Sequence, residues 1–442
     1  MARFYCRWRR VVLCVCSLFT SLVLLFLYVG ILLTMGMTDT TTSGTDRDHF
    51  IAPGASRNNG YAPCAKTFWQ NNQHGNAFWN NLQLVVDYRF NPIMSLHNSS
   101  RSCDKRTFYE SVRRQSFSKV KGMLNSDELP EMLQDFVSSM HRRDYSTLIQ
   151  PNGVCGAGAT DEKEAPLLLL AIKSTELNFK NRQAIRKTWG QAGWVSGQSS
   201  KGEEGGGYVR RIFLLGRENY DDLGGNPLEL LQRESELYGD ILQWDFMDTF
   251  FNLTLKDVLF WKWFSRYCNK TRFVFKGDDD VFVNTVKMMT YLQDQLKEPQ
   301  ADKEMKNFMV GYVIGGASPK RNNRSKYFIP DSFYRGLYPA YASGGGVIYS
   351  GQLTKRLHKI SERVHLFPID DTYVGMCMIR LNTFPAHHSA FLIFDFAGNE
   401  EDEGCSYHKI LVVHKRSPSE MIETWAQLKT QTQCWDAPLR QH

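Results

Sequence analysis

Three consecutive aspartates, Asp278, Asp279 and Asp280, stand between the apolar residues 273–275 and 281–283. Like charges this close repel one another, and apolar flanks draw them towards a folded interior, so the arrangement is costly without a cation. Oxygen ligands favour Mg²⁺ or Mn²⁺, which keep coordination positions for substrate phosphate oxygens. The triplet therefore indicates a metal site for a nucleoside diphosphate. On spacing alone, a solvated acidic turn competes with it, and an EF-hand calcium loop fits less well.

A second acidic pair, Asp370 and Asp371, lies among apolar residues and after a proline. This context predicts the start of a helix, where carboxylates cap free amides and meet the positive end of the dipole. Capping explains one carboxylate, and the other is a candidate general base that accepts a proton from a hydroxyl group. Upstream, Gly344, Gly345 and Gly346 would let the backbone approach a ligand closely, although an ordinary loop also contains such runs.

His414 follows the apolar residues 410–413, so it is expected at the end of a strand. A lone histidine is more often structural than a ligand. An oxygen-rich metal site without a nitrogen ligand keeps His414 as a candidate third ligand.

The elements that must position these groups begin at Pro166. Short apolar runs alternate with amphipathic segments, which predicts an α/β domain around a mostly parallel sheet covered on both faces. Ligands of such sheets bind beyond the carboxyl ends of the strands, where the aspartates emerge. The expected strands are residues 167–172, 211–215, 241–244 and 273–275, and the expected helices are residues 181–189 and 228–238.

The N-terminus predicts a membrane anchor. Four arginines precede the uncharged residues 11–33, which are long enough to cross a hydrocarbon core, whereas a cleavable signal peptide would have a shorter apolar stretch. Residues 1–10 are then a cytoplasmic tail, and the chain is a type II membrane protein. Residues 34–160 are expected to form a stem and an N-terminal extension, with a helix near residues 131–140, and residues 161–442 the catalytic domain.

The remaining composition agrees with a lumenal body. Seven cysteines lie beyond the predicted span without metal-binding or redox spacing, which predicts scattered disulfides and one cysteine left over. The net charge is +7, but most lysines and arginines are interspersed with aspartates and glutamates, so nucleic-acid binding is not indicated. Glycosylation sequons occur at Asn98, Asn252, Asn269 and Asn323.

Five ordered segments give the chain a resemblance to the β-1,3-glycosyltransferase family, and among its branches to the N-acetylglucosaminyltransferases that extend poly-N-acetyllactosamine. The likeness is strong from residue 166 to about residue 428. The segments that carry it are residues 182–190, 248–256, 276–284, 338–346 and 368–375.

This resemblance implies a GT-A fold, a Golgi location, UDP-GlcNAc as the donor, galactose-terminated glycan acceptors and Mn²⁺, with Mg²⁺ as a substitute. It also allows homo- or hetero-oligomers with other glycosyltransferases. By the family pattern, Asp278 and Asp280 bind the metal and diphosphate together with His414, and Asp371 is the catalytic base. The residues it implies for holding the substrates are Lys173, Arg182, Arg186, Asp278, Asp279, Gly344, Gly345, Gly346 and Asp370.

The expected reaction is an inverting transfer to the 3-hydroxyl of a terminal galactose. Two alternatives stay open. The chain could be a β-1,3-galactosyltransferase, which a donor screen would decide, or a catalytically silent, membrane-anchored glycan-binding protein, against which the intact acidic residues speak.

Overall fold

The computed structural model describes residues 77–90, 130–151, 155–158, 162–197, 205–218, 227–381 and 383–441. No helix within these ranges is long and apolar enough to cross a membrane. The predicted span at residues 11–33, Cys64, Cys103 and the sequon at Asn98 lie outside them.

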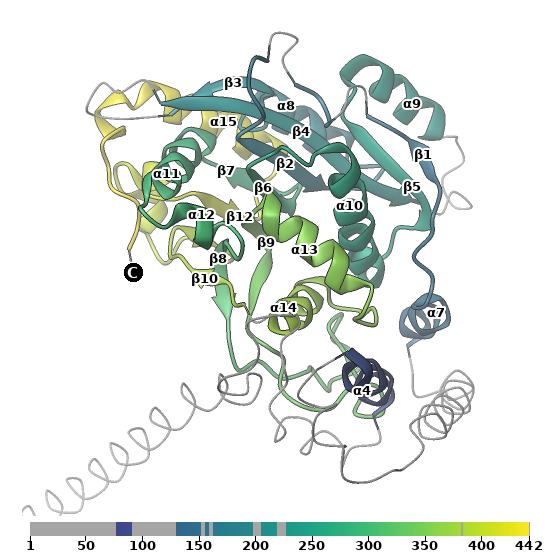
Figure 1. The fold of residues 1–442 in the computed structure, drawn as a ribbon. Coiled ribbons are helices and arrows are strands. Elements are labelled where there is room, and N and C mark those ends of the chain that lie inside the picture. Colours follow the sequence, from purple (N-terminus) through teal and green to yellow (C-terminus); the bar gives the residue numbers. More distant parts are fainter. Residues whose placement is uncertain are drawn as a thin grey trace, which may run out of the picture.

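The described residues form an α/β structure (Figure 1). Its strands are β1 (Thr147–Ile149), β2 (Leu168–Lys173), β3 (Gly193–Ser196), β4 (Gly206–Arg217), β5 (Ile241–Met247), β6 (Phe273–Asp278), β7 (Val281–Val283), β8 (Met309–Ile314), β9 (Tyr341–Ser350), β10 (Ala386–His387), β11 (Phe391–Leu392) and β12 (Val412–His414). Its α-helices are α4 (Phe78–Phe90), α7 (Glu131–Ser139), α8 (Phe179–Lys187), α9 (Pro227–Tyr238), α10 (Leu253–Tyr267), α11 (Thr285–Lys297), α12 (Ala301–Glu304), α13 (Gly351–Ser361), α14 (Asp370–Arg380) and α15 (Pro418–Thr430). Short 3₁₀ turns are η1 (Phe250–Asn252), η2 (Glu400–Asp402), η3 (Ser406–His408) and η4 (Thr432–Cys434).

The large sheet has the order β1-β5-β4-β2-β6-β9-β8-β10, with β3 paired to β4. Its centre, β5-β4-β2-β6, is parallel, as the alternation of strands and helices predicts. The expectation of a mostly parallel sheet is wrong outside this centre, because β9 runs antiparallel to both β6 and β8. The chain reaches β9 by turning back from β8 rather than through a helical crossover, so the sheet is mixed.

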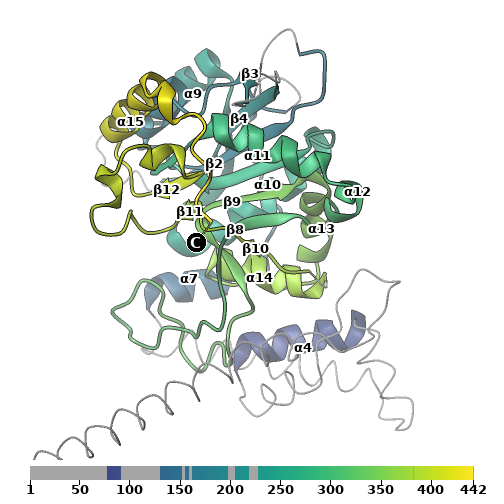
Figure 2. The ribbon, with the colours of Figure 1, turned by 90° about the vertical axis from the view of Figure 1, so that its left-hand side faces the viewer.

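Helices cover both faces of the sheet, which explains why all six residues of β2 are buried (Figures 1 and 2). Leu169 and Ala171 pack in a core with α10, α13 and α14. Leu168, Leu170 and Ile172 face the second core, which includes α8, α11 and α15. A small sheet of β11, β12 and β7 lies on that second side.

Helix α4 packs against the part of the domain that carries α14, although the two helices are far apart in sequence (Figures 1 and 2). The indole of Trp79 donates to the carbonyl of Leu366 at 3.0 Å and contacts the Phe367 ring edge-on. Asp87 accepts two hydrogen bonds from the guanidinium of Arg380, at 2.9 and 2.7 Å. The described part of the N-terminal extension is therefore packed on the domain.

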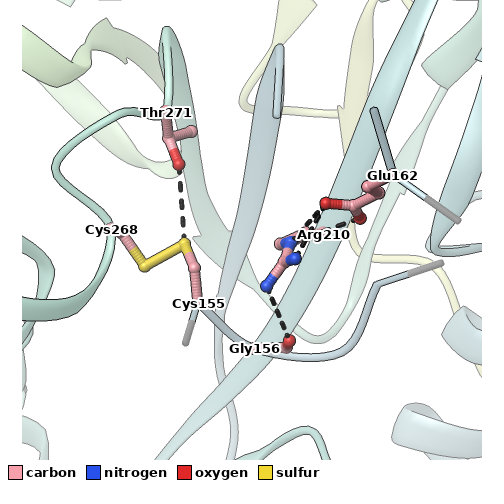
Figure 3. The surroundings of a disulfide bond; sticks show 6 residues. All are labelled: Cys155, Gly156, Glu162, Arg210, Cys268 and Thr271. Atoms are coloured by element: carbon pink, nitrogen blue, oxygen red, sulfur yellow. Dashed lines mark hydrogen bonds and ion pairs between the residues drawn. A yellow bond between two sulfur atoms is a disulfide. The ribbon is translucent and has the colours of Figure 1, made fainter. Parts of the chain in front are cut away.

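A disulfide joins the extension to the end of α10 (Figure 3). It links Cys155 to Cys268, and the hydroxyl of Thr271 lies 3.5 Å from the Cys155 sulfur. Beside it, Glu162 and Arg210 form an ion pair at 2.8 Å. A second disulfide, Cys405–Cys434, ties η4 to η3. Cys377 is buried and free, so scattered disulfides and a leftover cysteine are confirmed among the described residues.

Candidate active site

The carboxyl ends of β2 and β6 bring the first functional groups together. Lys173 and Asp278, the last residues of these strands, are paired in the parallel register. The Lys173 ammonium lies 3.3 Å from Asp278 and 2.6 Å from Asp370 at the first turn of α14. Lys173 is buried, and although burial lowers its pKa, the carboxylates of Asp278 and Asp370 raise that pKa well above its usual value. A permanently charged lysine thus joins the two acidic segments.

Asp278, Asp280 and His414 form a cluster of candidate metal ligands. One ligand atom from each residue lies within 4.8 Å of the others. The juxtaposition arises because β12 runs antiparallel to β7, which follows the aspartates directly and pairs His414 with Val281. His414 Nε2 lies 3.1 Å from Asp280 and 3.9 Å from Asp278. Two carboxylates and an imidazole on a half-buried surface suit a divalent cation.

The second nitrogen of His414 supports the same interpretation. Nδ1 lies 3.2 Å from the carbonyl of Ile393, which can only accept, so Nδ1 carries the proton in this contact. Nε2 then faces the carboxylates with its lone pair when the ring is neutral, the arrangement found in metal-ligating histidines. Without a cation, the hydrogen bond to Asp280 raises the pKa of His414. At Asp280, burial raises the pKa of the carboxyl. The hydrogen bond and charge of His414 outweigh burial, so the pKa of Asp280 is lowered.

Asp279 points away from this cluster. It is buried, and its carboxylate accepts hydrogen bonds from the Ser174 hydroxyl at 2.5 Å and the Asn178 amide at 3.0 Å. Burial raises its pKa to about 6 despite these donors. The sequence predicted that Asp279 binds the substrate, but its contacts show that it holds the segment between β2 and α8 in place.

The pair at the start of α14 divides into a buried and a half-buried carboxylate. Asp370 is buried against Lys173, whereas Asp371 is half-buried. Asp371 accepts from the backbone N–H of Gly344 at 3.3 Å and of Thr372 at 3.0 Å. The helix start is confirmed, with both aspartates in the first turn. Asp371 is the carboxylate of the pair that a substrate can reach.

The two carboxyls also titrate differently. Burial raises the pKa of Asp370, but the adjacent Lys173 outweighs burial and lowers that pKa to about 2. Burial and the negative charge of Asp370 raise the pKa of Asp371 to about 7. Neighbouring carboxyls whose pKa values diverge in this way are a common arrangement at catalytic sites. Asp371 is therefore a candidate proton acceptor near neutral pH.

The glycine run of β9 brings backbone close to both groups. A Cβ atom on Gly344 would lie 3.6 Å from Asp370 and 3.7 Å from the Lys173 ammonium, and one on Gly345 would lie 3.3 Å from the His414 ring. At Gly346 a Cβ atom would be 2.9 Å from Val412, so this glycine is needed for packing. Gly344 and Gly345 therefore border the site, and Gly346 supports it from behind.

Arg182 and Arg186 are placed differently from the expectation that they hold the nucleotide. Both are buried, and both form ion pairs with Glu234 on α9. Arg186 also pairs with Asp240 at 2.6 Å. Arg182 additionally donates to the Ser174 hydroxyl at 3.2 Å, the group that holds Asp279. These contacts make the two arginines part of the framework beneath the site rather than part of its open surface.

The sequence pattern does not predict several buried groups near the site. Lys276 and Asp257 form an ion pair at 2.5 Å beneath Lys173, and the Tyr338 hydroxyl has no partner among the described residues. Asp371 contributes to raising the pKa of Tyr341, after burial. Lys276 and Tyr338 belong to the segments that carry the family resemblance, which is the signal that could have found them.

The sequons within the described residues differ in their exposure. Asn269 and Asn323 are exposed, which suits glycan attachment. Asn252 is half-buried at the start of α10, and its side-chain amide donates to the carbonyl of Met247 at 2.8 Å. The fold itself therefore uses the Asn252 side chain.

A mixed α/β sheet with an Asp-X-Asp pair, a histidine and a separate carboxylate at its strand ends is an arrangement that suits a glycosyltransferase. Comparison with known proteins agrees: the model of the galactosyltransferase family matches residues 180–388. The chain is 40% identical over 370 residues to human N-acetyllactosaminide beta-1,3-N-acetylglucosaminyltransferase 2, covering 82% of this chain and 87% of that protein. It is 38% identical over 306 residues to rat UDP-GlcNAc:betaGal beta-1,3-N-acetylglucosaminyltransferase 7, covering 68% and 72%. The chain belongs to the galactosyltransferase family and groups with its β-1,3-N-acetylglucosaminyltransferases.

Among solved structures, the bifunctional glycosyltransferase WbbM matches 65% of this chain and 54% of its own, with a TM-score of 0.31 and 9% identity. A glycosyltransferase involved in glycosylation of the major capsid of PBCV-1 matches 59% of this chain and 100% of its own, with a TM-score of 0.28 and 12% identity. Scores this low add nothing to the assignment.

Proposed function

We propose that the protein is an inverting β-1,3-N-acetylglucosaminyltransferase of the GT-A type that transfers N-acetylglucosamine from UDP-GlcNAc to the 3-hydroxyl of a terminal galactose. The names of the relatives support the donor and the linkage. The observation that carries the proposal is the contact chain from the metal-ligand cluster to the base. Lys173 bridges Asp278 to Asp370, and Asp371 follows Asp370 in the first turn of α14. Donor phosphates and the acceptor hydroxyl would thus bind on adjacent carboxylates.

Each residue then has a defined task in the reaction. Asp278, Asp280 and His414 would hold Mn²⁺, or Mg²⁺ in its place, which supplies charge neutralisation at the leaving diphosphate. Asp371 accepts the proton of the galactose 3-hydroxyl while that oxygen bonds to C1 of the donor sugar. The bond from C1 to the diphosphate breaks, and its electron pair leaves with UDP. Attack opposite the leaving group converts an α-linked donor into a β-linked product.

The same proposal covers the cellular setting. A cytoplasmic tail at residues 1–10, a membrane anchor at residues 11–33, a stem reaching towards residue 160 and a lumenal GT-A domain from residue 161 suit an enzyme of the Golgi membrane. Two disulfides among the described residues support an oxidising compartment.

A donor screen tests the function most directly. With a galactose-terminated acceptor, turnover with UDP-GlcNAc should exceed turnover with UDP-Gal by at least roughly 100-fold, because a sugar pocket that binds an N-acetyl group leaves polar groups unpaired with the wrong donor. Linkage analysis of the product should give β-1,3. Preference for UDP-Gal would make the chain a galactosyltransferase, and absence of UDP release with every donor would favour a glycan-binding protein.

Removing one metal ligand should uncouple nucleotide binding from the cation. For Asp280→Ala, we expect the Mn²⁺-dependent part of the UDP affinity to be lost, because the cluster keeps only Asp278 and His414. Titration calorimetry of UDP with Mn²⁺ and with EDTA measures this difference. The matched control is Asp245→Ala, an exposed carboxylate on β5, which should bind as the wild type does. Unchanged metal dependence in Asp280→Ala would remove Asp280 from the ligand set.

The pH dependence should report the raised pKa of Asp371. A general base works only when deprotonated, so kcat at saturating donor, acceptor and Mn²⁺ should fall as the pH drops below about 7. The loss should approach tenfold per pH unit at lower pH. Saturating Mn²⁺ keeps protonation of His414 from contributing to the same limb. A kcat that stays level between about pH 5.5 and pH 8 would contradict this assignment.

A further inference from the structure

A cavity of about 380 Å³ is lined by residues of which none belongs to the candidate active site. Its wall includes β3, which pairs with the amino-terminal half of β4 beside the start of β2. Lys173 is the last residue of β2, whose six residues span roughly 17 Å, whereas β3 lies beside the first residues of that strand. The cavity therefore does not belong to the site already described.

Tryptophans dominate its lining. Four of the chain's ten tryptophans contribute to the wall: Trp189, Trp194, Trp425 and Trp435. Trp194 is 56% exposed and Trp435 is 43% exposed, although large aromatic side chains usually hide their surface. Two exposed indoles from segments far apart in the chain thus flank one concavity, which marks an interaction site rather than scattered surface residues.

The fold holds these indoles in place before any ligand arrives. Trp194 packs edge-on against Tyr208 at 5.1 Å, and a Cβ atom on Gly206 would meet its ring at 2.8 Å, so only glycine leaves room for the indole there. Trp435 follows Cys434 of a disulfide, and its carbonyl accepts from Lys287 at 2.6 Å. Rigid aromatic walls lower the entropy cost of binding.

The chemistry of the wall suits a neutral ligand with an apolar face and hydroxyl groups. No carboxylate lines the cavity among the described residues. Among the described residues that line it, Lys429 is the one charged side chain, and its ammonium lies 5.2 Å from the Trp425 ring. Hydroxyl and amide groups of Ser196 and Gln191 add polar contacts at exposed positions. A pyranose ring has this combination of a C–H face and hydroxyl groups.

We infer that this cavity is a second glycan-binding site, which takes a neutral galactose- or N-acetylglucosamine-containing unit of a long acceptor while another end of that glycan occupies the active site. The inference rests on the proposed function for the identity of the glycan. Its consequence is a preference for long or branched acceptors over short ones.

The test compares Trp194→Ala/Trp435→Ala with the wild type, using the full chain in lipid nanodiscs so that no detergent competes for the aromatic wall. Both side chains are partly exposed, so the fold should tolerate their removal. We expect KM for a lactosamine hexasaccharide to rise roughly 2- to 10-fold, as loss of aromatic contacts predicts, with kcat unchanged. KM for the lactosamine disaccharide should not change. Trp→Phe substitutions at both positions should restore most of the affinity.

Saturation-transfer NMR with the hexasaccharide, without UDP and with EDTA, measures binding independently of transfer. Part of the wild-type signal should disappear in the double variant and persist in Leu237→Ala, a control at a 72% exposed apolar side chain on α9. Identical signals and identical KM ratios in wild type and double variant would overturn the inference. The inference would also be overturned if light scattering gave the double variant half the molar mass of the wild type, because a second copy of the chain would then be the occupant of the cavity. If the wild type transfers nothing to either acceptor, the proposed function fails, while the NMR difference still decides the second site.

Discussion

Replacing Asp371 with asparagine is expected to lower kcat by roughly 1,000-fold while the affinity for UDP stays close to that of the wild type. A positioned general base contributes about 10²- to 10⁴-fold, and asparagine cannot take the proton of the acceptor hydroxyl. The fold should survive, because the amide oxygen can still accept the Thr372 N–H that Asp371 binds at 3.0 Å. Rates at saturating substrates, together with UDP titrations in Mn²⁺, measure the two effects separately.

The neighbouring carboxylate supplies the contrast for this experiment. Asp370→Asn removes the negative charge that lies 2.6 Å from the Lys173 ammonium, so it should lower the midpoint of thermal unfolding and weaken UDP binding through the altered Lys173–Asp278 contact. Near-normal turnover in Asp371→Asn would rule out Asp371 as the base. Equal losses of turnover and UDP affinity in that variant would place the residue in donor binding instead.

Breaking the ion pair between α4 and α14 is expected to give the second large effect, a loss of both stability and activity. Asp87→Ala leaves the buried guanidinium of Arg380 without its carboxylate, and such losses typically cost about 3–5 kcal/mol. Since Arg380 ends the helix that begins with Asp370 and Asp371, activity should fall together with stability. Denaturant unfolding monitored by tryptophan fluorescence, with activity assayed in parallel, measures both.

Two further variants compare the effect of a buried ion pair on stability with that of an exposed one. Glu229→Gln removes an exposed partner of Arg233 and should change the free energy of unfolding by less than about 1 kcal/mol. Asp87→Leu combined with Arg380→Met should recover part of the stability, because no charge is left buried. If Asp87→Ala unfolds like the wild type, α4 is not a structural part of the domain.

The expectations that the structure confirms rest on local pattern. The apolar run before Asp278 and the proline before Asp370 mark a strand end and a helix start, and both elements are present. His414 follows its short strand as expected. Periodicity and turn chemistry act over a few residues, so a single sequence carries them.

What sequence pattern missed depends on partners distant in the chain. Arg182 and Arg186 look free in a helix of basic residues, but their carboxylates, Glu234 and Asp240, come about 50 residues later. Asp279 differs from its neighbours because Ser174 and Asn178, about 100 residues earlier, lie beside it. The direction of β9 likewise depends on the strands with which it pairs, β6 and β8.

The pairing of Asp87 with Arg380 also constrains when the protein can mature. The two residues are 293 positions apart, so at translation rates of about 5–20 residues per second roughly 15 to 60 s pass between the synthesis of one and of the other. During that interval the apolar side of α4, with Trp79, has no partner. The nascent chain should therefore depend on chaperones until its last third has emerged, and slowed translation in that third should increase degradation.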